Sequence, residues 1–454
     1  MSETSEKQIK HYTKMTTEPV GHLLLELSIP TILSMLVTNI YNLVDTGFVG
    51  TLGTSESGAT GIVFAFMSIL QAIAFMCGHG SGSIMSQKLG AKDWDSANKY
   101  SSTGFFLSFA IGILIAIVSF IFMDPLVMLL GSTPTIAPYA KQYIFYLLIS
   151  APFFTSSLAM NNLLRYEGKA ALGTVGMLTG SILNIGGDAL FIKVFKMGIT
   201  GAGLSTAISQ FVSFCILLSM YLMHRTQTKI SLQCVTKNFA DIWNILATGF
   251  PSLLRQGLYC IATTLLNQGA GNYGDAAVSA MSIVSRVSFF PTAFALGIGQ
   301  GFQPISSYNY GAHQYARIRK AFWTAIIAQE IVMIVMAIPL ILFAGPVIRL
   351  LRDDTEVVEI GIRALTLMSI AQIFTPLSMM TEMGFQSIGK KMLASISSSL
   401  RSGIILIPTL IILINTRGLH GIQEAQPLAT ALTFIISIAL SRFYLKILNP
   451  KSIY

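Results

Sequence analysis

The sequence predicts an all-α polytopic membrane protein with twelve transmembrane helices, arranged as two pseudo-symmetric lobes of six helices each. Three observations predict this fold class. Charged residues make up only 11% of the 454 residues, whereas they make up about 25% of a soluble globular protein. Hydrophobic residues make up 53%, with a mean hydropathy of +0.66, and the chain contains one internal repeat. This composition excludes a soluble enzyme and a disordered chain.

The apolar residues are gathered in twelve long stretches that polar segments separate. A transmembrane helix needs about 20 mostly apolar residues, and each stretch is long enough. The stretches do not alternate polar with apolar residues, as the strands of a membrane β-barrel do. In chain order, the predicted spans are residues 23–48, 60–86, 98–123, 137–158, 167–192, 202–223, 242–268, 276–303, 318–343, 358–384, 392–414 and 425–447.

Polar segments lie before, between and after the two sets of six spans. Residues 1–22 are polar and charged, and the apolar run that follows is too long for the core of a signal peptide and has no small-residue cleavage site. We therefore expect the first span to remain in the protein. The predicted divisions are a cytoplasmic N-terminal arm (1–22), an N-lobe (23–223), a cytoplasmic linker (224–241), a C-lobe (242–447) and a cytoplasmic C-terminus (448–454).

The basic residues indicate the orientation in the membrane. Most of the 29 Lys and Arg residues lie in the N-terminal arm, in the loops that follow even-numbered spans, and after the last span. Such segments face the cytoplasm, so we expect both termini of this multi-pass protein to lie on the cytoplasmic side of the membrane. Because the net charge of +9 is scattered over short loops, we expect no nucleic-acid partner.

Glycines and prolines recur along the chain at a shift of 221 residues, so that Pro30 corresponds to Pro251. Each half has an even number of spans, so the two repeats have the same orientation and their symmetry axis lies along the membrane normal. Substrate sites in such folds lie near mid-membrane, and one lobe rocks against the other. A duplicated scaffold without transport is the alternative. Further pairs are Gly50 with Gly271, Gly90 with Gly311, Pro125 with Pro346, Gly168 with Gly389 and, at a shift of 220, Gly198 with Gly418.

Two aspartates interrupt the apolar spans of the first half. Asp45 lies in the first span and Asp188 in the fifth. Each follows a polar residue at a spacing of i to i+4, Tyr41 and Asn184 respectively, and this spacing places both members of a pair on one helix face. An ionisable residue inside a span is by default a candidate functional residue. The repeat places Leu266 and Thr409 at the equivalent positions, so the acidic pair belongs to one lobe only.

Further polar residues of the same lobe, Asn161, Asn162 and Thr206, suggest a small acidic, hydrogen-bonded pocket. A carboxylate in a cavity of low dielectric constant tends to hold a proton, and it can exchange that proton for an organic cation or a metal ion. Protonation and substrate binding would then compete for one pocket, as in an antiporter. The alternative is that both aspartates are structural residues that form hydrogen bonds between helices.

Other candidate residues carry weaker signals. The sequence does not assign a role to Arg255, Arg286 and Arg401 in the second half, or to His79 in the segment CGHGSGS. We expect Glu382 to lie at the cytoplasmic interface, close to Lys390. The four cysteines are expected to be buried hydrophobic residues, and the six histidines show no paired spacing, so we expect no metal site built from His or Cys.

Three segments resemble the MATE (multidrug and toxic compound extrusion) family: IPTILSMLVTNIYNLVDTGFVG, the loop GAKDW and LNIGGD. The similarity covers essentially the whole chain and is closest to the bacterial, MepA-like branch, which implies a bacterial cell membrane as the location of this protein. It implies the MATE fold, with a V-shaped pair of lobes, and export of amphipathic cationic drugs and dyes driven by a cation gradient. It also implies no catalytic residues. The substrate- and cation-binding positions that it implies are Asp45, Asp188, Tyr41, Asn184, Asn161 and Thr206.

The resemblance also bears on the coupling ion. The NorM-like branch of the family uses acidic residues in the seventh and tenth transmembrane spans. In this sequence the seventh span (242–268) contains Arg255, and the tenth (358–384) has no acid in its middle. We therefore expect no sodium site in the C-lobe and expect proton coupling through the N-lobe, with sodium at Asp45 and Asp188 left open. We expect no other cofactor. The expected partners are small-molecule cations and the lipid bilayer, and the protein is expected to be a monomer.

Three other functions are weighed against multidrug export. A lipid-linked precursor flippase of the same superfamily would often have more spans and a basic central cavity, and the three intramembrane arginines keep this alternative open. An intramembrane enzyme or channel would need a nucleophile–base pair, an HExxH or Walker motif, or a ring of charged residues. A carrier of the major facilitator type would have a strongly basic loop after the second span, where this chain has QKLGAKDWDSANK.

Overall fold

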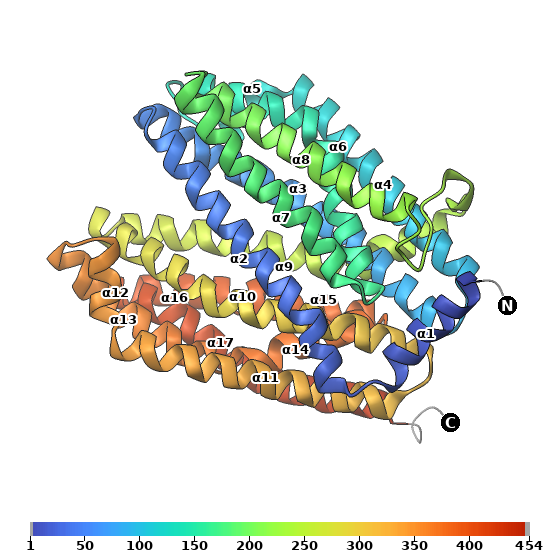
Figure 1. Ribbon diagram of the computed structural model, residues 1–454. Helices are drawn as coiled ribbons and strands as arrows, with labels where there is room; N and C mark the ends of the chain where they lie inside the picture. The colour runs from blue at the N-terminus through green and yellow to red at the C-terminus, as the bar shows by residue number, and fades with distance from the viewer. Residues whose placement is uncertain (1–2, 450–454) are drawn as a thin grey trace. The chain divides into compact units, whose positions relative to one another are not determined.

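The computed structural model describes residues 3–449, and every regular element in that range is a helix (Figure 1). All twelve predicted spans are helical. The elements are α1 (Glu3–Thr17), α2 (Val20–Gly50), α3 (Thr54–Gly90), α4 (Trp94–Ile121), α5 (Met123–Leu129), α6 (Ala137–Tyr166), α7 (Ala170–Asp188), η1 (Ala189–Val194), α8 (Ile199–Leu222), η2 (Leu232–Cys234), α9 (Phe239–Gly271), α10 (Asp275–Gly311), α11 (Tyr315–Leu342), α12 (Ala344–Leu351), α13 (Thr355–Gln372), α14 (Thr375–Ser387), α15 (Lys391–Ser399), η3 (Leu400–Ile404), α16 (Leu406–Arg417) and α17 (Leu419–Ile447).

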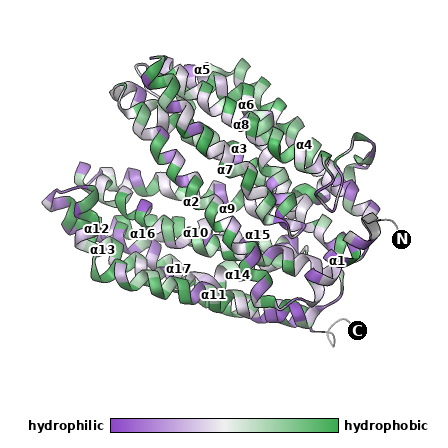
Figure 2. Cartoon of the chain, viewed as in Figure 1, coloured by the Kyte–Doolittle hydropathy of each residue, from purple (hydrophilic) through white to green (hydrophobic). Residues whose placement is uncertain are grey.

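The helices support the predicted membrane class. Ten of the described helices are long and apolar enough to cross a membrane, and α13 with α14, bent by 50° at their junction, forms an eleventh. The remaining predicted span, 242–268, lies in α9, which has 33 residues and is long enough but is not apolar enough by the same test. Hydrophobic residues predominate along the helices in Figure 2. The N-terminal arm, expected only to be polar, forms the helix α1.

The backbone repeats the pattern found in the sequence. Outside glycine, positive φ angles are rare, yet Lys92 (62°) and His313 (57°) both adopt one, and they are 221 residues apart. Gly198 and Gly418 share a φ of 61° at the start of α8 and α17. A β-carbon is disfavoured at such angles, which explains why these two glycines recur in both halves.

The chain forms two compact units. Unit 1 contains Leu33–Gly249 and the start of the chain up to Tyr12, and unit 2 contains Thr13–Ile32 and the chain from Phe250 onward. The units therefore differ from the two halves of the repeat, because their boundaries fall inside the helices α1, α2 and α9. The boundaries in α2 and α9 lie beside Pro30 and Pro251, the equivalent prolines of the repeat, and a proline inside a helix removes one backbone hydrogen bond.

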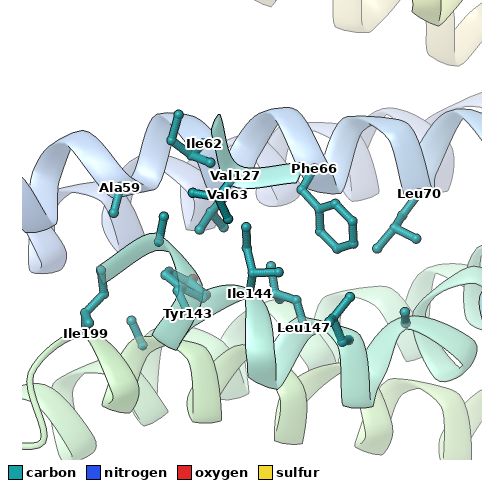
Figure 3. Packing of buried hydrophobic residues seen from close by; sticks show 14 of the residues in the cluster. Ala59, Ile62, Val63, Phe66, Leu70, Val127, Tyr143, Ile144, Leu147 and Ile199 are labelled. Atoms are coloured by element: carbon teal, nitrogen blue, oxygen red, sulfur yellow. The ribbon is translucent and has the colours of Figure 1, made fainter. Parts of the chain in front are cut away.

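The two units have equivalent hydrophobic cores. In unit 1, side chains of α3 such as Val63 and Phe66 face Ile144 and Leu147 of α6, and Val127 of α5 lies beside them (Figure 3). In unit 2 the repeat equivalents of three of these residues, Val284, Ile348 and Leu365, belong to the core cluster of α10, α12 and α13. The duplicated sequence therefore builds the same core twice.

The linker 224–241 is attached to unit 1 throughout its length. Glu167, fully buried after the end of α6, accepts hydrogen bonds from the backbone nitrogens of Gln227 (2.8 Å) and Thr228 (3.0 Å) and from the Thr228 hydroxyl. Further along, side chains in the 98–103 segment of α4 bind the linker backbone at Lys229, Ser231 and Thr236. The linker is thus an integral part of unit 1.

Glycine permits a very close helix contact at the end of unit 1. A β-carbon on Gly249 of α9 would overlap the backbone of Met76 in α3, and one on Gly80 would overlap the backbone of Ile245. Gly257, two turns further along α9, has no atom within 4 Å of the position that its β-carbon would take. Two glycines of one helix therefore offer a matched comparison.

We expect Gly249→Ala to lower the free energy of unfolding by about 1–3 kcal/mol, because the added methyl group must displace backbone atoms. Gly257→Ala should raise it by up to about 1 kcal/mol, because alanine favours the helix and fills open space. Thermal unfolding of both proteins in detergent measures the difference. Equal melting temperatures for the two variants would contradict the close contact.

We expect Glu167→Ala to release the linker from unit 1, because three donors lose their buried acceptor. Limited trypsin digestion, with sites at the exposed Lys229 and Lys237, should then cut the linker several times faster than in the wild type. Asp95→Ala is the control, since Asp95 is an exposed acid of α4 with no hydrogen bond to the linker. An unchanged cleavage rate in Glu167→Ala would show that the α4 contacts hold the linker alone.

Candidate functional site

A cavity of about 110 Å³ lies within unit 1, between α2, α3, α6, α7 and α8. Its walls combine apolar side chains, among them Phe64, Met67, Phe154 and Met177, with a larger number of polar ones. The polar residues that line it are Thr38, Tyr41, Asn42, Asp45, Thr46, Thr60, Ser68, Gln71, Tyr143, Ser181, Asn184, Thr206, Gln210 and Ser213.

A chain of hydrogen bonds ends on Asp45. The Tyr143 hydroxyl donates to Asp45 Oδ2 at 3.0 Å and lies 3.0 Å from Thr206 Oγ1. Because Tyr143 has one hydroxyl proton, the Thr206 hydroxyl donates in turn to the Tyr143 oxygen. Asn184 Nδ2 donates to Thr206 Oγ1 at 3.1 Å. The donors therefore run from α7 through α8 and α6 to the carboxyl group on α2, and they stabilise a charged Asp45.

Asp188 lies behind the wall of this cavity and is fully buried. Neither of its carboxyl oxygens has a hydrogen-bond partner among residues 3–449, and the same is true of Asp45 Oδ1. The two carboxyl groups are close enough to interact through their charges. Buried carboxylate oxygens without donors are strongly disfavoured, so this pair of acids needs a proton or another cation.

The local backbone at Asp188 is also unusual. Asp188 is the last residue of α7, and the π-helical turn η1 follows it directly. π-helical turns are rare and are frequent at functional sites. The turn carries the helix on to Val194, and it places Asp188 at the point where the regular hydrogen-bond pattern changes.

The structure brings together four of the six predicted site residues. Tyr41, Asp45, Asn184 and Thr206 line the cavity, and Asp188 is buried against it. Asn161 does not join them: a β-carbon on Gly173 of α7 would touch its side chain, and it lies about one helical turn beyond Leu158, the last residue of α6 in the cavity wall.

Sequence reasoning missed Tyr143, which links two of the predicted residues. A signal was present, because the repeat places Ala364 at the equivalent position. Tyr143 is therefore confined to the first half, as Asp45 and Asp188 are. A tyrosine within an apolar span is also an ordinary core residue, and Tyr143 does belong to the core cluster of unit 1 (Figure 3).

Two of the other candidates, His79 of α3 and Asn162 of α6, are not among the residues that line the cavity. Arg165 Nη2 lies 2.8 Å from His79 Nε2 and donates to the Asn162 side chain. All three side chains are buried, and Phe75 stacks on the His79 ring with centroids 5.1 Å apart. His79 is therefore a packed core residue of α3 that contacts the end of α6.

Unit 2 has a reduced version of the same cavity. Its volume is about 20 Å³, and it is lined by Met281, Val284, Ser288 and Met368, which are the repeat equivalents of Thr60, Val63, Met67 and Leu147. No acidic residue lines it. The acidic site therefore belongs to unit 1.

One group of side chains in the described range has the spacing to hold a metal ion. The ligand atoms of Glu18, His22 and Glu26 lie within 4.8 Å of one another. However, His22 is 69% exposed and already binds Glu18, and Glu26 is paired with Lys14 at 2.5 Å. These contacts describe an ion-paired surface cluster at the start of α2.

Comparison with known proteins agrees with the repeat and with the fold. A family model described as MatE matches the chain twice, over residues 30–190 and 251–412. The multidrug export protein MepA of Staphylococcus aureus (strain MSSA476) is 24% identical over 428 residues, which cover 94% of each protein. The protein of the same name from Staphylococcus saprophyticus is 25% identical over 407 residues, 88% of each.

Solved structures with the same fold come from transporters. One is described as the outward-facing conformation of a multidrug resistance MATE family transporter of the MOP superfamily; it is 25% identical, covers 96% of this chain and 98% of that one, and gives a TM-score of 0.90. Another is described as MATE in the bent conformation, with 27% identity, coverage of 97% and 100% and a TM-score of 0.88. The predicted family resemblance and the all-α fold are thereby confirmed.

We expect Tyr143→Phe to lower the free energy of unfolding by about 1–3 kcal/mol, because it removes the hydrogen bond to a buried carboxylate while keeping the aromatic ring in the core. Tyr146→Phe is the control: Tyr146 lies one turn along the same helix, and its hydroxyl makes no hydrogen bond within the described chain. Its effect should stay within about 0.5 kcal/mol. Thermal unfolding compares the two, and an equal effect would contradict the hydrogen-bond chain.

Proposed function

We propose that this chain, which belongs to the MatE family, is a multidrug efflux antiporter that exports amphipathic, mostly cationic compounds in exchange for protons. Membership of the family follows from the two matches of the MatE model, which together span most of the chain. The family consists of membrane transporters, so the chain is a multi-pass membrane transporter. The coupling ion, the charge of the cargo and the role of the acidic cavity are the proposed part.

The observation that carries the proposal is the pair of acids with unsatisfied oxygens. Asp45 Oδ1 and both oxygens of Asp188 are buried without a donor, and an uncompensated charge of this kind is expensive to bury. A proton on the pair removes much of that penalty, and so does a bound cation. Either species excludes the other, because both occupy the same two carboxyl groups. Competition of this kind is sufficient to couple the two fluxes in an antiporter.

The size of the cavity supports a small coupling ion in this conformation. About 110 Å³ has room for several water molecules, since one needs roughly 10–15 Å³. Drug-sized ligands occupy pockets of about 300–1,000 Å³. The cavity as it stands therefore suits a proton on a hydrated carboxyl pair, or a small cation, and binding of a drug requires it to widen. Its apolar wall of Phe64, Met67 and Met177 then offers adaptable contacts.

Widening fits alternating access with bending at equivalent prolines. Two boundaries of the compact units lie beside Pro30 in α2 and Pro251 in α9. Asp45 and Tyr41 follow Pro30 on α2, so a bend at this proline changes the direction of α2 where it enters the unit that holds the cavity. The relative described in a bent conformation is consistent with such a movement. We further propose that the protein is a monomer with both termini in the cytoplasm.

We expect Asp45→Asn and Asp188→Asn each to slow ethidium efflux from membrane vesicles at least about tenfold, which corresponds to a barrier change of 1.36 kcal/mol or more. Neutral asparagine cannot exchange a proton for a cation. Asp95→Asn, an exposed acid outside the spans, is the control and should transport like the wild type. Wild-type rates in both site variants, at matched expression, would exclude the carboxyl mechanism.

The coupling ion is tested in proteoliposomes with proton and sodium gradients imposed separately. We expect a proton gradient alone to drive uptake of ethidium and a sodium gradient alone to have no effect. If sodium alone drives transport and Asp45→Asn abolishes it, then sodium binds at the same carboxyl pair. No additional cofactor is needed in either case.

A further inference from the structure

A buried charge cluster in unit 2 has no role in the proposed function. Glu382 of α14 accepts a hydrogen bond from Arg255 Nη1 of α9 at 2.8 Å and from Arg401 Nη2 of η3 at 3.2 Å. We call these three residues the arginine–glutamate triad. The prediction that Glu382 lies at the cytoplasmic interface is wrong, because its side chain is 0% exposed. Two arginines from distant segments enclose it.

The triad has an excess of positive charge. Two guanidinium groups and one carboxylate sum to one net positive charge in a region where the glutamate is inaccessible and the arginine side chains are only 11% and 20% exposed. A buried charge without a counter-ion is destabilising by several kcal/mol. A structural ion pair needs only one arginine for one glutamate, so the second arginine requires another explanation.

The arginines also keep most of their donors unused. A guanidinium group has five N–H donors, and within the described chain Arg255 and Arg401 each donate one hydrogen bond, both to Glu382. Arg401 Nε is buried and has no partner there. The Arg255 and Arg401 side chains are 11% and 20% exposed, so neither is completely enclosed. The triad therefore combines unused donors and a net positive charge with arginine side chains that are not fully buried.

The repeat shows that the scaffold does not require these charges. The equivalent positions in the first half are Ser34, Asn161 and Gly180, which are all neutral. Gly180 lines the acidic cavity of unit 1, so Arg401 occupies the place in unit 2 that corresponds to a cavity wall in unit 1. Arg401 also lies on the π-helical turn η3, as Asp188 directly precedes η1. The two halves thus carry opposite charge beside π-helical turns.

We propose that the arginine–glutamate triad is a binding site for an oxyanion: the carboxylate, sulfonate or phosphate group of an amphipathic molecule. Arginine is the side chain best suited to such groups, because its planar fork of donors matches two oxygens. Glu382 is a built-in competitor that accepts one hydrogen bond from each arginine when no anion is bound. Arg401 makes the longer contact with it and turns to the ligand. This inference rests on the proposed transport function and extends its cargo to anionic amphipaths.

The first test measures anion binding by the full-length protein in detergent, as the rise of the melting temperature with sodium sulfate compared with sodium chloride at equal ionic strength. We expect sulfate to stabilise the wild type. The matched control is Arg286→Gln, which changes an exposed arginine of the same unit, and sulfate should stabilise this variant as well. Arg401→Gln, which keeps the neutral Arg255–Glu382 pair, should lose the effect. Glu382→Gln should bind sulfate about tenfold more tightly, because removing one competing charge-assisted hydrogen bond is worth about that factor.

A purely structural ion network gives the opposite result. Glu382→Gln would then be destabilised with no gain in sulfate response, and Arg401→Gln would respond to sulfate as the wild type does. That outcome overturns the proposal. If Glu382→Gln does not fold, the sulfate response of Arg401→Gln compared with that of Arg286→Gln still tests the proposal. Arg401→Gln should fold, because the Arg255–Glu382 pair that remains in it is neutral.

The second test distinguishes soluble anions from lipid headgroups as the ligand. It also tests the oxyanion site separately from the proposed cation export. In proteoliposomes, export of carboxyfluorescein should fall at least fivefold in Arg401→Gln while ethidium transport is unchanged. If phosphatidylglycerol vesicles stabilise the wild type but not Arg401→Gln, and carboxyfluorescein is not exported, then the oxyanion is that of a lipid and the site stands. If neither probe responds to Arg401→Gln while Asp45→Asn still abolishes ethidium transport, the oxyanion site is excluded and the cation exporter remains.

Discussion

The structure depends on one constraint: a polar group within the hydrocarbon layer must find its partner inside the protein. An unsatisfied group there is disfavoured by several kcal/mol, so every regular element of the described chain is a helix and most buried polar side chains form hydrogen bonds. Against that background, the exceptions are informative. The unpaired oxygens of Asp45 and Asp188 and the unused donors of Arg401 are places where the protein itself does not supply the partner.

Duplication explains how such exceptions are supported. The two halves repeat the hydrophobic core, the positive φ angles and the prolines inside their first long helices, so that each unit is stabilised by the same packing. The residues that differ between the halves are then free to carry charge. In unit 1 the acids have a tyrosine, a threonine and an asparagine from three other helices around them, whereas unit 2 has alanine and leucine at two of the matching positions and two arginines nearby. Symmetry supplies the scaffold, and departures from it supply the chemistry.

The sequence alone was sufficient for the helices and for much of the site, because hydropathy, glycine and proline positions and isolated charges are local signals. Asp45, Tyr41, Asn184 and Thr206 could be grouped because they interrupt apolar spans of one half. Tyr143 could not be recognised from its own span, since its ring is a core residue and only its hydroxyl contacts the site. Glu382 was placed wrongly because its partners, Arg255 and Arg401, lie 127 and 19 residues away, and such pairing depends on tertiary structure.

The boundaries of the compact units have a consequence for biosynthesis. The segment Thr13–Ile32 packs in unit 2, where Ser28 and Ile32 contact Gly301 and Gly297 so closely that a β-carbon on either glycine would collide with them. These glycines are translated more than 260 residues later. The beginning of α2 therefore leaves the ribosome long before its packing surface exists, and unit 1 in turn is complete only when the first turns of α9 have been made. Neither half of the gene encodes a self-sufficient folding unit, although each encodes a full copy of the repeat.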